Sequence, residues 1–230
     1  MGFNLCRRLF PILAVVSFSA AMDGQDVIPP ARTILDLGES EQIAFINKTI
    51  GLGFPENRAD QMTMLIINRS AVALPLIESK LEDALKSTST PKRLVDTATE
   101  MIAYAGDEQA LRAVSKLMAV DENRFGPLVG RTLDNAGNWR NPCTVAYRGL
   151  ELGNEAVSRY TVAWMESALA SNRMQRTWAE AMLDRYGKVP GDTEWATDPI
   201  ASQLKDRASP ELRQGVMRFA AEVLSKREKR

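Results

Sequence analysis

The feature that most constrains this chain is an apolar periodicity of three to four residues that continues from about residue 39 almost to the last residue. It is clearest in residues 91–105, 108–120 and 210–224, where apolar side chains recur at i, i+3, i+4 and i+7. This spacing places the apolar side chains on one face of a helix. No segment sustains the alternation of apolar and polar residues that a half-buried strand requires. The sequence therefore predicts an all-α protein.

Proline and glycine positions predict where these helices begin and end. A proline loses no hydrogen bond at the first helical position, and a preceding Asn, Asp, Ser or Thr accepts an N–H group of the first turn. Four pairs have this form: Thr90-Pro91, Asn141-Pro142, Asp198-Pro199 and Ser209-Pro210. Glycines frequently end helices in the left-handed conformation. Four glycines follow periodic segments and are predicted to do so: Gly106, Gly137, Gly153 and Gly187.

The predicted helices number about nine or ten, and the short loops between them make consecutive helices antiparallel neighbours. The segment after Gly106, Asp-Glu-Gln-Ala-Leu, is echoed after Gly153 by Asn-Glu-Ala-Val, 47 residues later. In this respect residues 58–187 resemble α-helical repeat proteins of the HEAT or armadillo kind, whose repeats are about 40–47 residues long. The resemblance implies an α-solenoid. A compact, irregular multi-helix bundle is the alternative fold.

The first 21 residues have the three parts of a secretory signal peptide. Arg7 and Arg8 precede an apolar segment at 9–21, which ends with small residues at Ser19 and Ala21. A membrane anchor is the alternative, but a spanning helix needs about 20 apolar residues, and this segment is shorter. We therefore expect an exported chain, periplasmic or extracellular, that begins near residue 22 and has no stable membrane insertion after cleavage.

Behind the signal peptide, the sequence predicts a loose arm or linker at residues 22–38 and a single helical domain at residues 39–230. Residues 1–21 contain two of the 29 basic residues and none of the 29 acidic ones, so the exported chain has a small negative net charge. This charge argues against a nucleic-acid partner, because nucleic-acid-binding domains are visibly basic. Of the two cysteines, only Cys143 remains in the exported chain. No internal disulfide can form, and the domain depends on helix packing.

The chain contains no histidine, which removes many catalytic mechanisms. A serine or cysteine triad that uses histidine is excluded, as is a zinc site built from histidines and cysteines. The sequence also lacks the glycine-rich phosphate-binding motifs, so we expect no cofactor and no bound metal. Carboxylates are the remaining acid–base groups, and a pair across a cleft would suit a hydrolase. The candidates for such a pair are Glu166, Glu180, Asp184, Glu194 and Asp198.

Cys143 is a candidate reactive thiol. It follows Asn141-Pro142 and is therefore predicted in the first turn of a helix. The positive end of the helix dipole lowers the pKa of a thiol there. The alternative is that Cys143 is a buried, inert side chain, which is the more common situation for a cysteine. The sequence favours the buried alternative, because it shows no base that could activate the thiol.

Two tryptophans lie in polar segments predicted as loops, and they are the candidate binding residues. Trp139 is followed by Arg140, and Trp195 is followed closely by Asp198, so all four residues are candidates for binding. Tryptophan and arginine are frequent anchors of protein interfaces. The alternative is that each tryptophan packs onto the core and holds its loop in place. Trp164 and Trp178 lie on helical faces, where a core position is expected.

These observations favour a non-enzymatic, exported helical scaffold that binds a protein or peptide. Stacked helix pairs form extended binding surfaces, and the absence of histidine argues against most catalysis near neutral pH. The alternative function is a small carboxylate-dependent hydrolase that acts on an envelope or extracellular polymer. Two buried acids with raised pKa values in one pocket would favour the hydrolase.

Overall fold

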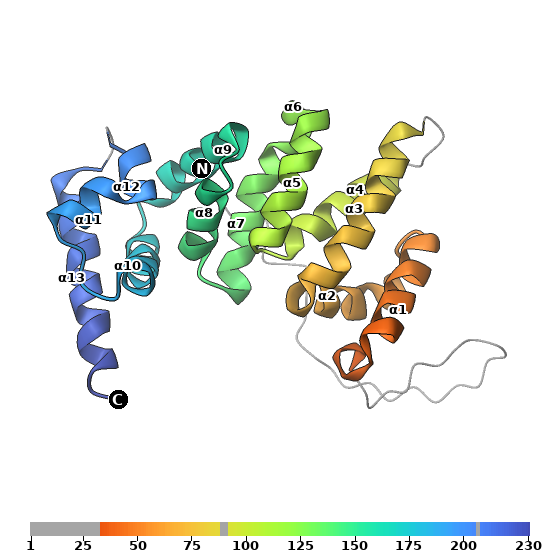
Figure 1. Cartoon of the computed structure of the whole chain (residues 1–230), viewed down its shortest axis with the longest axis horizontal. Coiled ribbons are helices and arrows are strands. Elements are labelled where there is room, and N and C mark those ends of the chain that lie inside the picture. Colours follow the sequence, from red (N-terminus) through yellow and green to blue (C-terminus); the bar gives the residue numbers. More distant parts are fainter. Residues whose placement is uncertain (1–32, 88–91, 206–207) are drawn as a thin grey trace. The chain divides into compact units, whose positions relative to one another are not determined.

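The computed structural model describes residues 33–87, 92–205 and 208–230, and these residues are helical, with no strand among them. Figure 1 shows the helices in chain order. Their bounds are η1 (Ile34–Asp36), α1 (Glu39–Gly51), η2 (Glu56–Arg58), α2 (Ala59–Asn68), α3 (Ser70–Lys86), α4 (Lys92–Tyr104), α5 (Glu108–Val120), α6 (Glu122–Phe125), α7 (Pro127–Trp139), α8 (Pro142–Glu151), α9 (Glu155–Ala168), α10 (Asn172–Tyr186), α11 (Asp192–Thr197), α12 (Pro199–Gln203) and α13 (Pro210–Arg227). The predicted all-α class is confirmed. The described residues form more helices than predicted, and one of the short ones, α11, occupies a segment expected to be a loop.

The predicted helix starts are confirmed at three of the four proline pairs. The side chains of Asn141, Asp198 and Ser209 each accept at least one backbone N–H of the following turn. The fourth pair, Thr90-Pro91, lies outside the described residues. These starts are predictable because the cap, the proline and the N–H groups lie within four residues of one another.

Three of the four predicted glycine ends are confirmed, and Gly137 is wrong. Gly106, Gly153 and Gly187 have φ values of +59°, +67° and +69°. Gly137 instead lies inside α7, which continues to Trp139. The polar segment around Trp139 is therefore helical and not the predicted loop. Local composition favoured a loop, but packing of α7 against α4, α8 and α9 favours the longer helix.

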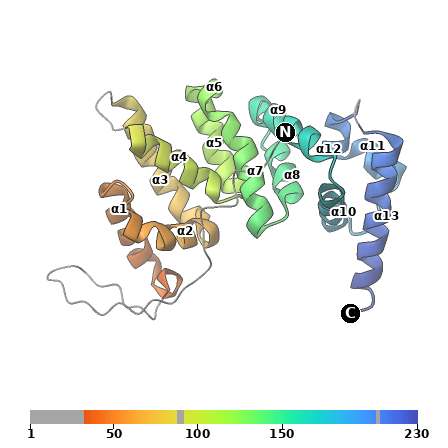
Figure 2. The ribbon, with the colours of Figure 1, turned by 180° about the vertical axis from the view of Figure 1, so that it is seen from behind.

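Contacts between helices follow two series. In the first series α2 contacts α4, α4 contacts α7, and α7 contacts α9. In the second series α1 contacts α3, α3 contacts α5, α5 contacts α8, and α8 contacts α10, which packs extensively on α13. Figures 1 and 2 show α4, α5 and α7 beside one another from opposite sides. The apolar faces that the periodicity predicts are buried between the two series, with Ile66, Leu81, Ile102, Leu111 and Val129 almost inaccessible to solvent.

Many polar contacts between helices join residues that are 30–39 apart, which is fewer than the 47 residues that separate Gly106 and Gly153. Ser70 bonds Asp107, Lys116 pairs with Glu78, Asn154 bonds Ser115, and Asn141 bonds Thr177. The partners in these four contacts are 36–39 residues apart. Gly106 precedes a helix of the second series, whereas Gly153 precedes a helix of the first. The similar segments after Gly106 and Gly153 are therefore two examples of the same helix-capping motif, and their separation is not the repeat length of the helix contacts.

Residues 33–38, which the sequence assigned to the loose arm, pack against the helices. Ile34 is buried, and η1 contacts α2. The side-chain amide of Gln42 donates to the backbone carbonyls of Ile34, Leu35 and Leu37, which fixes this segment on α1. The predicted signal peptide at 1–21 and residues 22–32 lie outside the described residues. None of the helices in the described ranges is long and apolar enough to span a bilayer.

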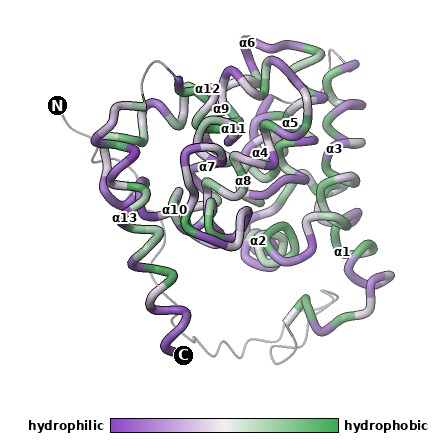
Figure 3. Tube along the Cα trace, turned by 60° about the vertical axis from the view of Figure 1, so that its left-hand side comes forward, coloured by the Kyte–Doolittle hydropathy of each residue, from purple (hydrophilic) through white to green (hydrophobic). Residues whose placement is uncertain are grey.

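Figure 3 shows hydrophobic and hydrophilic residues alternating along α13. The buried side chains of this helix include Leu212, Val216, Phe219 and Ala220, which follow the predicted periodicity. Beyond Ala220 the helix becomes more exposed, and its last residues are hydrophilic. The described residues all belong to one compact unit, and α13 is its C-terminal helix.

Candidate functional site

Asp198 joins three helices through hydrogen bonds. Its Oδ1 accepts the N–H groups of Ile200 and Ala201 at 3.0 Å each, which caps α12. Its Oδ2 accepts the hydroxyl groups of Tyr147 at 2.8 Å and Tyr186 at 3.0 Å, which come from α8 and α10. Asp198 is fully buried. A buried carboxylate is stable only when its oxygens are paired, and these four donors provide that pairing.

Aromatic rings complete this arrangement, which we call the Asp198 cluster: Tyr147, Trp178, Tyr186, Trp195 and Asp198. The indole N–H of Trp178 donates to the Tyr147 hydroxyl at 2.9 Å. The rings of Trp178 and Trp195 lie 5.2 Å apart. Burial, together with the negative charge of Asp198, raises the pKa values of Tyr147 and Tyr186. Both hydroxyls therefore remain protonated donors at neutral pH, and the cluster acts as a structural joint between α8, α10, α11 and α12.

Arg140 holds three helix ends together. Its guanidinium donates to the carbonyl of Ala105 at 2.9 Å and to the carbonyl of Ile67 at 2.6 Å. It also lies 3.5 Å from the carboxylate of Asp107, which caps α5 and accepts the hydroxyl of Ser70. Helix C-termini leave carbonyls without a partner, and a cation there satisfies them. Arg140 therefore has a structural role, whatever binding role it also has.

Trp139 is the most exposed of the residues predicted to bind. Its exposed fraction is 47%, and its ring contacts the ring of Tyr104 on α4 at 6.1 Å. The structure does not bring it together with Trp195 and Asp198, which lie in the Asp198 cluster. The four predicted residues thus occupy three places: the exposed end of α7, the joint made by Arg140, and the Asp198 cluster. Their role in binding stays a prediction.

Cys143 lies in the first turn of α8, as predicted, but its surroundings do not activate it. Its side chain is completely buried, and its Sγ lies 3.5 Å from the sulfur of Met174. Burial raises the pKa of the thiol, and the negative charges of Glu180 and Asp198 raise it further. The expected lowering of the pKa by the helix dipole is therefore wrong, because desolvation of the thiolate outweighs it. The interpretation of Cys143 as a buried, inert residue fits this position.

We predict that a thiol reagent such as dithionitrobenzoate does not label Cys143 in the native protein at pH 8. Since the pKa is raised, the thiolate fraction stays small at this pH, and burial also blocks the reagent. In denaturant the thiol is exposed, and labelling should approach one equivalent per chain. Absorbance of the released thionitrobenzoate measures this. Rapid labelling without denaturant would contradict the prediction.

A groove of about 610 Å³ lies where α7, α8, α9 and α10 meet, and we call it the α7–α10 groove. Its charged residues are two cations, Arg140 and Arg173, and two acids, Asp134 and Glu180. The ring of Trp164 forms part of its wall, and the indole N–H donates to Asp134 at 2.8 Å. Asn138 adds a side-chain amide. The amide of Asn141 is already used, because its N–H donates to the carbonyl of Thr177 and its oxygen accepts the N–H groups of Cys143 and Thr144.

Of the predicted binding residues only Arg140 lines this groove. Sequence reasoning missed Asp134, Trp164 and Arg173 as groove residues, because they lie on three helices and nothing in their local sequence relates them. Glu180 was a candidate acid for a hydrolase, and the structure places it on the same helix as Arg173, α10, in the lining of the same groove. The sequence signal for a binding residue was a tryptophan next to side-chain amides in a polar segment. This signal identified Trp139 and not Trp164.

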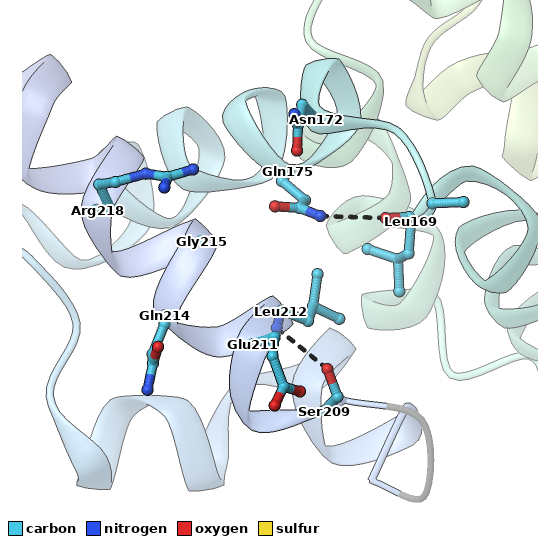
Figure 4. A pocket seen from close by; sticks show the side chains of 10 residues that line it. Leu169, Asn172, Gln175, Ser209, Glu211, Leu212, Gln214, Gly215 and Arg218 are labelled. Atoms are coloured by element: carbon cyan, nitrogen blue, oxygen red, sulfur yellow. Dashed lines mark hydrogen bonds between the residues drawn. The ribbon is translucent and has the colours of Figure 1, made fainter.

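A second hollow, of about 750 Å³, lies between α10 and the first half of α13. Figure 4 shows Gln175 pointing into it, with the amide donating to the carbonyl of Leu169 at 3.4 Å. Gly215 lies beside it, and a Cβ there would lie 2.5 Å from Oε1 of Gln175, so the end of that side chain would have to move. The acid that lines this hollow, Glu211, is exposed, and hydrogen bonds from its own N–H and from Ser209 lower its pKa. Glu211 therefore lacks the raised pKa that a general acid requires.

Among the described residues, no group of three or more cysteines, aspartates or glutamates is placed to hold a metal ion. Comparisons with protein families, with curated proteins and with solved structures gave no match to this chain. The site must therefore be interpreted from its own geometry.

Proposed function

We propose that this chain is an exported, non-enzymatic helical scaffold that binds a peptide segment of a partner protein in the α7–α10 groove. The observation that carries the proposal is the groove itself, with opposite charges, a side-chain amide and an indole wall. Small-molecule pockets are mostly apolar and enclosed, whereas the lining of this groove is about as polar as it is apolar, and the groove opens to the surface. Such a lining suits a peptide, whose backbone offers N–H and carbonyl groups and whose side chains offer charges.

We also propose that the helices stack as a short α-solenoid and not as an irregular bundle. Two observations support this: the two series of contacts among alternate helices, and polar contacts between residues 30–39 apart. In a solenoid each repeat contacts its neighbours, and the stacked faces form extended binding surfaces. The α7–α10 groove would lie between consecutive repeats. Export remains part of the proposal because it rests on residues 1–21.

The test of this function is selection of peptides from a displayed library against the exported chain, followed by charge reversal in the groove. Arg173→Glu and Glu180→Lys change the charges of the α10 wall at partly or fully exposed positions. We expect each variant to weaken binding of the selected peptides by about tenfold, which corresponds to about 1.4 kcal/mol. Fluorescence anisotropy with labelled peptides measures the affinity.

The matched control is Lys80→Glu, which reverses an exposed charge on α3, away from this groove. Trp139→Ala is added to test the binding role predicted for that tryptophan. It is a better probe than Trp195→Ala, because Trp195 packs on the buried Trp178 and its removal would also affect folding. Selected peptides that bind all variants equally would place the binding surface elsewhere.

A further inference from the structure

The second half of α13 and the facing side of α10 form a basic surface that the proposed groove does not include. Together they line a hollow of about 370 Å³, with Arg176 and Glu180 from α10 and Val223, Lys226, Arg227 and Arg230 from α13 and the residues after it. Four of these six residues are cations. Glu180 also lines the α7–α10 groove, so the two depressions share one residue of α10.

The charge of this surface differs from that of the chain as a whole. The full chain has 29 basic and 29 acidic residues. Residues 218–230 contain five basic residues, Arg218, Lys226, Arg227, Lys229 and Arg230, against two acidic ones, Glu222 and Glu228. This excess of basic residues at the end of α13 gives a local positive potential, which Glu180 and Asp184 of α10 reduce, and which attracts an anionic partner.

The surface already binds carboxylates of its own chain. The guanidinium of Arg176 donates to both carboxylate oxygens of Glu222, at 3.3 and 3.2 Å. Lys226 bonds the same carboxylate at 2.8 Å, and Arg227 bonds Asp184 at 2.8 Å. This two-point geometry is the strong form of arginine–carboxylate recognition. The cations of α10 and α13 are therefore positioned to bind carboxylates.

An aromatic ring fixes the orientation of the central arginine. The guanidinium of Arg176 lies over the ring of Phe219 at 4.7 Å, and that of Arg218 lies over the same ring at 4.8 Å. Phe219 is buried, so the ring is a fixed platform. An arginine held in this way loses less side-chain entropy when it binds a carboxylate.

We propose that this α10–α13 surface binds an acidic peptide segment of the partner. The inference rests on the proposed peptide-binding function and adds the chemistry of the partner. Glu180, Asp184 and Glu222 alternate with the cations, and they would repel the closely spaced phosphates of a nucleic acid. A peptide can match this pattern, because it places carboxylates between neutral residues and can bring an apolar side chain to Val223.

The test uses a fluorescein-labelled peptide of alternating glutamate and valine residues and the exported full chain. A peptide of the same length with glutamine in place of glutamate is the reference. We expect the acidic peptide to bind, the glutamine peptide to bind at least about fivefold more weakly, and the difference to shrink between about 20 and 200 mM salt as charges are screened. Anisotropy measures both affinities.

Three variants locate the site. The double variant Lys226→Glu, Arg230→Glu reverses two exposed positive charges and should weaken binding of the acidic peptide by at least about fivefold. The control Lys80→Glu should change the affinity for this peptide by less than about twofold. Glu222→Gln removes the carboxylate that occupies Arg176 and Lys226, and should therefore strengthen binding of the acidic peptide. Circular dichroism checks that each variant retains its helices.

Equal binding of the acidic and glutamine peptides would overturn the inference, as would a double variant with unchanged affinity. The chain could also bind vesicles of phosphatidylcholine and phosphatidylglycerol more strongly than the acidic peptide, with the same loss in the double variant. That result would overturn the inference in favour of a membrane surface. These results are separable from the proposed function. Selected peptides that depend on Arg173 and Glu180, together with no binding of the acidic probe, would leave the groove in place and remove only this inference.

Discussion

Gly106→Ala is expected to destabilise the protein by about 3 kcal/mol. Gly106 has a φ of +59°, which an L-residue with a Cβ adopts only at a cost of about 1 kcal/mol or more. In addition, a Cβ at this position would lie 2.6 Å from the backbone nitrogen of Ala136 and 2.8 Å from its Cα. These are backbone atoms of α7, so the clash is relieved only by moving the helix, at a further cost of about 1–3 kcal/mol.

The matched control is Gly153→Ala. Gly153 has a similar φ of +67° and also precedes a capped helix, but no atom lies within 4 Å of the position that its Cβ would take. Its substitution should therefore cost only the conformational strain, about 1 kcal/mol. Urea denaturation followed by circular dichroism gives the free energy of unfolding of both variants. Equal losses would show that α7 does not approach Gly106 as closely as described.

Asp198→Ala is expected to destabilise the protein by about 4 kcal/mol, provided that it folds at all. The substitution removes the cap of α12 and leaves the hydroxyls of Tyr147 and Tyr186 without their acceptor. Loss of a cap costs about 1 kcal/mol, and the buried hydroxyl of Tyr147 without a partner adds about 1–3 kcal/mol. The hydroxyl of Tyr186 is only partly buried and adds less, because water can replace its acceptor. The loss is a large part of the stability of a typical domain, which is about 5–15 kcal/mol.

Two controls separate the buried hydrogen bonds from general effects of removing an aspartate. Asp198→Asn keeps an acceptor for the amides of Ile200 and Ala201, so it should cost less than half as much as Asp198→Ala. Asp83→Ala removes an exposed aspartate on α3 and should change stability by less than about 0.5 kcal/mol. Urea denaturation measures all three. A loss for Asp198→Ala no greater than that for Asp83→Ala would contradict the four hydrogen bonds described.

The binding residues show the limit of local reasoning. Trp139 and Trp195 were predicted from their polar neighbours in sequence, but the groove wall is formed by Trp164, which looked like a core residue. Arg140 was predicted as an interface residue, and the structure gives it three partners at helix ends. Cys143 lies in the first turn of a helix, as the sequence predicts, and burial of its thiol raises the pKa that the helix end alone would lower.

The sequence by itself determined which segments are helical and where many of the helices begin and end. Those features depend on groups within about four residues of one another, such as Asn141 and the N–H groups of Cys143 and Thr144. Only the tertiary structure decided which polar residues meet. Arg140 reaches the carbonyl of Ile67 across 73 residues, and Tyr147 reaches Asp198 across 51. Such pairs follow from how helices pack against one another, and packing depends on the whole set of apolar faces rather than on any local pattern.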